Sequence, residues 1–404
     1  MNIVNTLYDA LPSVASTLTE LQIHWKYTYS YFPVTISLGR LLRICRKLTS
    51  IILDVNEIID STCQPFALSH TTSLTHIELH QTVRNLKLLY FESLFRYSPE
   101  LQHLTMSIAS DPDILPILDG WCSKLISVEI NKEKFRSFDH EIADITPRKD
   151  SIPGKLERLI LDGVRTLEPI LPLLHESTQS IHSMCLAPAD DAWLDWTPLR
   201  TFVLPRLTYL HLDCQKSPES FLRDQIPVII GQCPALEKLV LQNKPQDPQR
   251  SVTVPLYQAI AKLSRLSYLR LRYFDISGSM FIQLLAHCAS QCSLRELGLI
   301  FCENLTGATM QWIARIKSLE TLELIAPGLK ITAGDTLAFT RLLSTELNRL
   351  STLKLGLMKL TDQDIRSIGQ CKNLSRLLLK KVIGLTADGS TMLRGRIQQF
   401  EVVQ

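Results

Sequence analysis

Four residues have the types and the spacing that a metal site requires. His76, Glu78 and His80 alternate along one stretch, so in a β-strand their side chains would lie on one face. His103 takes the equivalent place in the next similar stretch. Imidazoles and carboxylates are common zinc ligands. The same residues also suit a solvated polar face, and no cysteine joins them, so we predict no metal and no other cofactor.

The sequence carries no motif of a familiar enzyme class. A G-x-S-x-G elbow and an H-E-x-x-H helix are absent, and 15 glycines in 404 residues leave little room for phosphate-binding loops. A GTPase-activating protein would need a placed arginine, for which Arg270 and Arg272 are the candidates. We therefore predict a binding protein and not an enzyme.

A hydrophobic repeat must position all of these residues. Leu374, Leu377 and Leu379 occupy positions 1, 4 and 6 of an L-x-x-L-x-L pattern that recurs about every 27 residues. The fifteen copies start at Leu18, Leu48, Leu74, Leu101, Leu125, Leu156, Ile181, Leu207, Leu236, Leu266, Leu294, Leu319, Leu350, Leu374 and Ile397. This period is typical of leucine-rich repeats, which contain one strand and one helix each.

The repeat predicts the fold class and the domain organisation. We expect an α/β leucine-rich-repeat solenoid, a horseshoe with parallel strands on the concave face and helices on the convex face. One domain of about fifteen repeats would cover residues 1–404, with no F-box visible. Spacings of three and four residues predict helices over 7–17, 36–46, 86–97, 167–176, 220–231, 280–289, 309–316, 337–347 and 365–370. Asp275 and Thr361 are predicted N-caps.

Three segments depart from the pattern. Residues 131–155 and 243–255 are polar and contain proline, which predicts surface loops. Residues 187–205 contain Trp193 and Trp196 beside three acids. These tryptophans would either form a contact site or replace a helix beneath the edge of the solenoid, and we favour the second arrangement.

The amino-acid composition limits the classes of partner and the cellular compartment that we expect. The net charge of +3 and the pI near 8.3 give no electrostatic reason to expect a nucleic-acid partner. No apolar run approaches the ~20 residues of a membrane span, and the start resembles no secretory signal. Four of the ten cysteines, Cys45, Cys122, Cys233 and Cys371, lie three residues before a repeat start, which predicts buried reduced thiols. We expect a cytoplasmic or nuclear protein without a membrane partner.

Two stretches carry a more specific resemblance. The first is Leu294 to Leu299 followed by Cys302, Leu305, Thr306 and Ile313, and the second is Leu360 to Asp362 followed by Ile365, Ile368, Cys371 and Leu374. Both resemble the cysteine-containing subtype of leucine-rich repeat, which is similar to the repeats of F-box/LRR proteins in the ribonuclease-inhibitor-like superfamily. The resemblance implies the substrate receptor of an SCF ubiquitin ligase, whose adaptor would bind through flanking sequence. The alternative is a scaffold or regulator without a ubiquitin link.

The concave face is the predicted binding surface, because positions 3, 5 and 7 of each repeat point there. On the first eight repeats these positions hold six acids and one base, and on the last seven they hold six bases and three acids. Tyrosine and arginine are enriched in interface hot spots. The predicted contact residues are Tyr209, His211, Lys238, Tyr268, Arg270, Arg272, Arg376 and Lys380.

Overall fold

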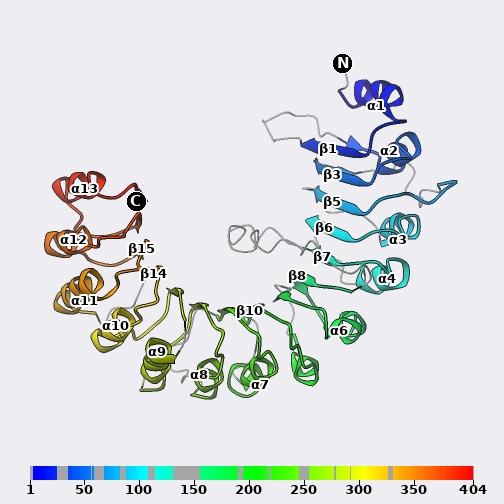
Figure 1. Cartoon of the computed structure of the whole chain (residues 1–404). Helices are drawn as coiled ribbons and strands as arrows, with labels where there is room; N and C mark the ends of the chain where they lie inside the picture. Colours follow the sequence, from blue (N-terminus) through cyan, green and yellow to red (C-terminus); the bar gives the residue numbers. More distant parts are fainter. Residues whose placement is uncertain are drawn as a thin grey trace. The chain divides into compact units, whose positions relative to one another are not determined.

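The structure is a computed structural model of the 404-residue chain. It describes residues 3–24, 35–55, 57–58, 68–81, 88–107, 114–130, 155–189, 194–215, 217, 220–244, 254–276, 279–291, 293–325 and 331–403. The chain divides into two compact units, Met1–Pro198 and Leu199–Gln404, called unit 1 and unit 2 below. Each unit is a parallel sheet with helices along one side (Figure 1).

In the described part of unit 1, seven strands pair in chain order. They are β1 (Glu20–His24), β3 (Ser50–Val55), β5 (His76–Gln81), β6 (His103–Ser107), β7 (Ser127–Ile130), β8 (Arg158–Val164) and β9 (Ser183–Pro188). Two short strands, β2 (Thr35–Ile36) and β4 (Glu57–Ile58), form a separate pair. The helices are α1 (Ile3–Val14), α2 (Leu38–Ile44), α3 (Leu88–Arg96), α4 (Ile114–Trp121) and α6 (Leu171–Ser177).

Unit 2 continues the same arrangement with eight described strands. They are β10 (Tyr209–Asp213), β11 (Lys238–Gln242), β12 (Tyr268–Arg272), β13 (Glu296–Ile300), β14 (Thr321–Ile325), β15 (Thr352–Gly356), β16 (Arg376–Lys380) and β17 (Gln399–Val403). The helices are η3 (Phe221–Gln225), α7 (Ile226–Gly231), α8 (Val254–Ala261), α9 (Ser279–Gln291), α10 (Gly307–Ala314), α11 (Ala333–Glu346), α12 (Asp362–Ile368) and α13 (Ala387–Arg394). A 3₁₀ turn, η2 (Thr197–Thr201), lies at the boundary of the units.

The predicted register of the repeats is confirmed. Each of the fifteen sheet strands named above begins at position 3 of a predicted repeat. Adjacent strands pair in register, so that Leu269 lies beside Leu297 and Leu297 beside Leu322, and a register shift occurs at the end of β8, between Asp162 and Val164. Residues at one position of successive repeats therefore form a row across the sheet. The α/β leucine-rich-repeat solenoid is the fold of this chain.

The rows at positions 1, 4 and 6 make the core. Among the inner repeats every residue at these positions is buried, and most are leucine or isoleucine. In the outermost repeats most of the equivalent residues, such as Leu21 on β1 and Phe400 on β17, are only half-buried, although Ile397 is buried. A single repeat cannot cover its own apolar face, so burial comes from the neighbours on both sides.

A second row of contacts lies where the strands begin. The carbonyl at position 2 of one repeat accepts the N–H groups at positions 2 and 3 of the next, as Thr19 does from Thr49 and Ser50 at 2.8 and 3.1 Å. Hydroxyl side chains reinforce the row, because Thr75 donates to the Thr49 carbonyl at 3.1 Å. These bonds satisfy backbone groups that would otherwise be lost at the turn into each strand.

The helices agree with the prediction except at a few places. Helices α4, α8 and α13 were not predicted, and α8 begins at Val254 inside the segment predicted as a loop. Pro255 fits there because the first turn of a helix needs no donor. The predicted loop at 131–154 lies outside the described residues.

Only one of the two predicted N-caps is confirmed. The Thr361 hydroxyl accepts from the backbone N–H of Asp364, whose carboxylate accepts from Thr361 N–H in return. Asp275 is not a cap, because α9 begins later, at Ser279. Its carboxylate accepts the Asn304 amide at 2.9 Å instead, and therefore joins two repeats.

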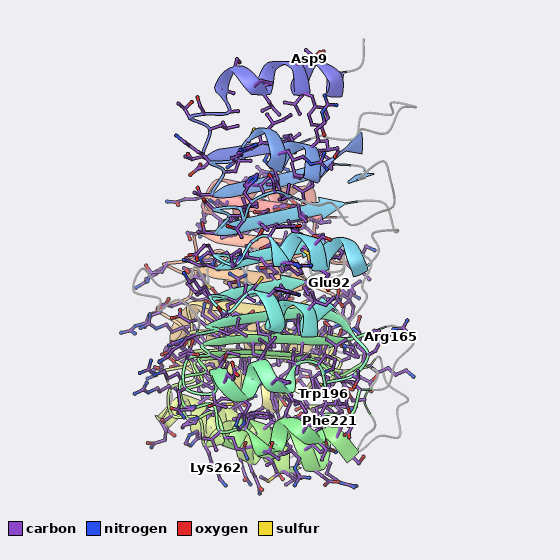
Figure 2. The ribbon with its side chains drawn as sticks, turned by 90° about the vertical axis from the view of Figure 1, so that its right-hand side faces the viewer. Asp9, Glu92, Arg165, Trp196, Phe221 and Lys262 are labelled. Carbon is purple, nitrogen blue, oxygen red and sulfur yellow. The ribbon has the colours of Figure 1, made fainter. Side chains whose placement is uncertain are left out.

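Trp196, labelled in Figure 2, is 1% exposed and directly precedes η2, so it is buried and does not form an exposed contact site, as we favoured. Trp193 lies outside the described residues. None of the eight described cysteines forms a disulfide, and burial raises the pKa of Cys122, Cys233 and Cys302 to about 12. No helix in the described ranges is long and apolar enough to cross a membrane.

Substituting Leu297 tests the register of the core. Leu297 on β13 is at position 4 of its repeat and is 1% exposed, so Leu297→Asp would bury a carboxylate among leucines. We expect a loss of at least about 4 kcal/mol of stability, measured as a large drop in the melting temperature. The control is Leu357→Asp, because Leu357 is 44% exposed. Equal melting temperatures for the two variants would contradict the assigned register.

Candidate functional site

The sheet surface opposite the helices, made by positions 3, 5 and 7 of the repeats, is called the strand face below. In the middle of unit 2 this face is occupied by buried polar side chains that bind one another. Arg270 Nη2 on β12 lies 2.5 Å from Glu323 Oε2 on β14, and their side chains are 10% and 12% exposed. Lys354 on β15 approaches the same carboxylate at 3.9 Å. The three charges therefore form one network along position 5.

A glycine makes this network possible. Gly298 stands between Arg270 and Glu323 at position 5 of β13. A Cβ atom at residue 298 would lie 2.9 Å from Cγ of Arg270. The missing side chain therefore lets the arginine extend over β13 and reach the second strand along.

His211 lies beside this network and is fully buried. It occupies position 5 of β10, one strand beyond Val240 in the row that leads to Arg270. Burial, followed by the positive charges of Arg270 and Arg272, lowers its pKa to about 3. His211 is therefore a neutral core residue at physiological pH and not a contact residue.

Arg272 belongs to the row at position 7 of the repeats, next to the position-5 row that contains Arg270. Its Nη1 lies 3.4 Å from Oε1 of Gln242, whose amide in turn donates to Asp213 at 3.4 Å. The guanidinium also lies over the Tyr273 ring at 5.2 Å, and that ring stacks on Phe301 with centroids 5.2 Å apart. The Arg272 guanidinium is thus held by a hydrogen bond and by an aromatic ring of the protein itself.

In unit 1 the strand face carries the histidine and glutamate residues considered for zinc. His80 Nε2 lies 2.5 Å from one Glu78 oxygen and His76 Nε2 lies 3.7 Å from the other. His80 Nδ1 approaches Ser107 Oγ at 2.9 Å. Hydrogen bonds with the two imidazoles lower the pKa of Glu78 to about 2. The described residues contain no group with metal-binding geometry.

His103 on β6 completes this cluster, with its ring centroid 5.9 Å from that of His76. Burial, followed by the neighbouring His76, lowers the pKa of His103. Further along the sheet, Arg158 donates to Glu129 at 3.0 Å. Charged groups on the strand face of unit 1 are therefore also linked to one another.

The structure places six of the eight predicted contact residues on β10, β11 and β12, and the other two on β16. Tyr209, Lys238 and Tyr268 are adjacent in one row at position 3, with Tyr209 buried and the other two half-buried. Arg376 and Lys380 on β16 are exposed, and they lie four strands from β12, roughly 19 Å at ordinary strand spacing. A contact surface centred on β12 therefore does not include all eight predicted residues.

One expectation about these residues is wrong. We expected Arg270 to be a contact residue on the binding surface, but it is buried in an ion pair with Glu323. Reading position 5 down successive repeats as Arg, Gly, Glu and Lys would have revealed the network, because the row places these residues side by side. Exposure could not be read from the single strand.

The Arg270–Glu323 pair can be tested with a double-mutant cycle. Glu323→Leu leaves the buried Arg270 charge without its carboxylate, so we expect a loss of about 3 kcal/mol. Arg270→Met combined with Glu323→Leu should recover most of that loss, because both charges are then removed. Melting and denaturant curves of the four proteins give the coupling free energy. Additive effects would show that the two side chains do not interact.

His211 makes a pH-dependent contribution to stability. Below about pH 6.5 the unfolded chain binds a proton at this histidine that the folded chain excludes until about pH 3. Stability should therefore fall as the pH falls through this window, by up to about 1.4 kcal/mol per pH unit. His211→Gln should flatten the slope of unfolding free energy between pH 6.5 and 5, a range that lies above the Glu78 titration. An unchanged slope would contradict a neutral buried His211.

No protein-family model and no curated protein sequence matches the chain. Solved structures similar to it include an internalin (inlF) from Listeria monocytogenes str. 4b F2365, at 15% identity and TM-score 0.46 over 98% of this chain and 94% of that one. The complex of Rad7 and Elc1 in yeast matches at 16% identity and TM-score 0.47, covering 85% and 81%. The TLR13–ssRNA13 complex matches at 13% identity and TM-score 0.43, covering 97% and 50%. These values describe a likeness in general architecture.

Proposed function

We propose that this chain is a protein-interaction module that acts by binding and not by catalysis. The supporting observation is the strand face itself, on which side chains stand in continuous rows within each unit. Solenoids use such extended surfaces to bind partners. We also propose that residues 1–404 work as one domain of about fifteen repeats.

The more specific proposal is the substrate-recognition part of an F-box/LRR-type SCF ubiquitin ligase. It is supported by the structural roles of the residues that carry the resemblance. The Cys302 thiol is buried and donates to the Leu271 carbonyl of the preceding repeat at 3.3 Å. Thr306 and Thr361 cap α10 and α12, whose Ile313 and Ile365 are fully buried. Cys302 therefore links two neighbouring repeats, and the threonines and isoleucines begin and bury the helices of their own repeats.

The alternative is a scaffold or regulator without a ubiquitin link. Both roles predict that partners bind the strand face. They differ in the flanking sequence, which binds a ubiquitin-ligase adaptor only in the first role. For either role we propose a cytoplasmic or nuclear protein, supported by the buried cysteines without disulfides. Nucleic-acid and membrane partners are not part of the proposal, because the net charge is only +3.

Immunoprecipitation of the gene product tests the ligase proposal. The product, tagged at its own locus, should capture a cullin and its adaptor together with one or more substrate proteins. Arg376→Glu combined with Lys380→Glu should reduce the substrates at least about fivefold and leave the cullin, because charges on a binding face act on the partner. The control is Arg341→Glu, an exposed change on α11.

Capture of partner proteins without a cullin or adaptor would support the scaffold. Equal loss of substrates in the Arg341→Glu control and in the β16 variant would show that the strand face is not the recognition surface. Unchanged melting temperatures of both variants are a required check. Exposed charges contribute little to stability, so we expect changes below about 1 kcal/mol.

A further inference from the structure

Six residues at the C-terminal ends of β15, β16 and β17 form a surface that we call the basic rim: Leu357, Lys359, Lys380, Lys381, Ile383 and Val403. Their adjacency follows from the strand register. Lys380 pairs with Val403, and the N–H of Lys381 donates to the Val403 carbonyl. Leu357 N–H donates to the Lys380 carbonyl, and Lys359 bridges to Ile383. Each lysine therefore has an aliphatic residue on a neighbouring repeat.

The aliphatic members of the basic rim are exposed. Ile383 is 68% exposed, Leu357 44% and Val403 36%, which makes them three of the most exposed large hydrophobic residues in the described part of the chain. Exposed aliphatic residues gathered in one place often mark an interaction site. Here they alternate with three positive charges.

The three lysines of the basic rim differ from the bases in the middle of unit 2. All three are exposed, and among the described residues no ion pair involves them. Arg270 and Lys354, in contrast, share the Glu323 carboxylate. Glu401 is the acid on β17, two residues before Val403. The positive charge of the basic rim is therefore available to a partner.

The backbone at the basic rim is strained at two positions. Leu357 has a φ of 53° and Lys381 a φ of 49°, both in the left-handed region that disfavours residues with a bulky side chain. Glycine or asparagine would relieve this strain. Leu357 gains no full burial in return, since it is 44% exposed. The same backbone occurs at the equivalent position of two further repeats, at Tyr273 and Phe301, so it belongs to the repeat, and at Leu357 it holds an aliphatic side chain exposed at the rim.

We propose that the basic rim binds an acidic peptide segment that carries aliphatic side chains. The inference rests on the proposed binding function and adds the class of partner. Carboxylates of the segment pair with Lys359, Lys380 and Lys381, and its aliphatic side chains cover Leu357, Ile383 and Val403. Three strands span about 10 Å, and an extended chain advances about 3.3 Å per residue. The acids and aliphatic residues of the segment therefore lie within about four residues of each other.

Charge and shape favour a peptide over other anions. Proteins that bind single-stranded nucleic acids use aromatic side chains, on which the nucleobases stack, as well as lysines and arginines. The basic rim has no aromatic residue. A membrane surface would engage a broad basic and apolar face, whereas three lysines and three aliphatic residues here fit one short segment. Both of these ligands serve as alternatives in the experiment.

Selection from a displayed library of random peptides, roughly 12 residues long so that they exceed the rim, identifies the segment with the whole chain as target. We expect enriched sequences with acids and Leu, Ile or Val within about four residues, and binding that weakens as salt rises. A labelled enriched peptide is then titrated by fluorescence anisotropy. Lys380→Glu with Lys381→Glu should weaken it at least about tenfold, and the control Lys372→Glu with Arg394→Glu should not.

Leu357→Asn separates contact from folding. Asparagine accepts the left-handed backbone, so the melting temperature should stay the same or rise while peptide affinity falls about fivefold or more. Enriched peptides without the acidic and aliphatic pattern, or affinities unchanged in the rim variants, would overturn the proposal. So would a failure to enrich any peptide when phosphatidylserine vesicles or a single-stranded oligonucleotide bind in a Lys380- and Lys381-dependent way.

The two proposals fail in distinguishable ways. Peptide binding that depends on the basic rim, without a cullin in the immunoprecipitate, would retain the rim and reject the ligase. A captured cullin with rim variants that bind peptide like the native chain would retain the ligase and reject the rim.

Discussion

Parallel strands hold residues at the same position of successive repeats side by side, about 4.8 Å apart. The rows at positions 3 to 6 of the inner repeats obey that constraint within each unit, because neighbouring strands pair in register there, and a register shift, between Asp162 and Val164, lies at the end of β8. Leucine at positions 1, 4 and 6 satisfies it in the core, where each inner side chain is covered from both sides. The rows also explain how one residue acts on the neighbouring repeat: Gly298 leaves room for the Arg270 side chain, and Asn304 donates to Asp275.

On the strand face the same constraint decides which charges a partner can reach. In the row at position 5 the arginine, glycine, glutamate and lysine of four successive strands come together, and the network they form is internal. At the basic rim the rows place lysines beside aliphatic residues, so no neighbour neutralises them. Charge composition alone makes the two areas look alike, whereas the row neighbours make one structural and the other available.

This division suits a binding module. A network such as Arg270–Glu323 keeps several strands in one arrangement, since breaking either partner leaves a buried charge. A rigid surface loses less conformational entropy when a partner binds. In our proposal the contacts themselves come from exposed residues, such as Lys380 and Ile383.

The leucine spacing predicts the repeat register, the strand starts and the buried rows, because leucines at a constant spacing can be covered only by stacking the repeats. It also predicted the Thr361 cap and the position of Trp196. Helices α4, α8 and α13 were missed, since short outer segments carry a weak periodic signal and proline obscures it. Which polar residues are accessible became clear from the packing of neighbouring repeats. Arg270 is buried because Gly298 on the next strand leaves room for it and Glu323 on the strand beyond binds it. Lys380 stays exposed because its neighbours are Gly356 and Val403. Accessibility on such a sheet depends on side chains from other repeats, which a single stretch of sequence does not contain.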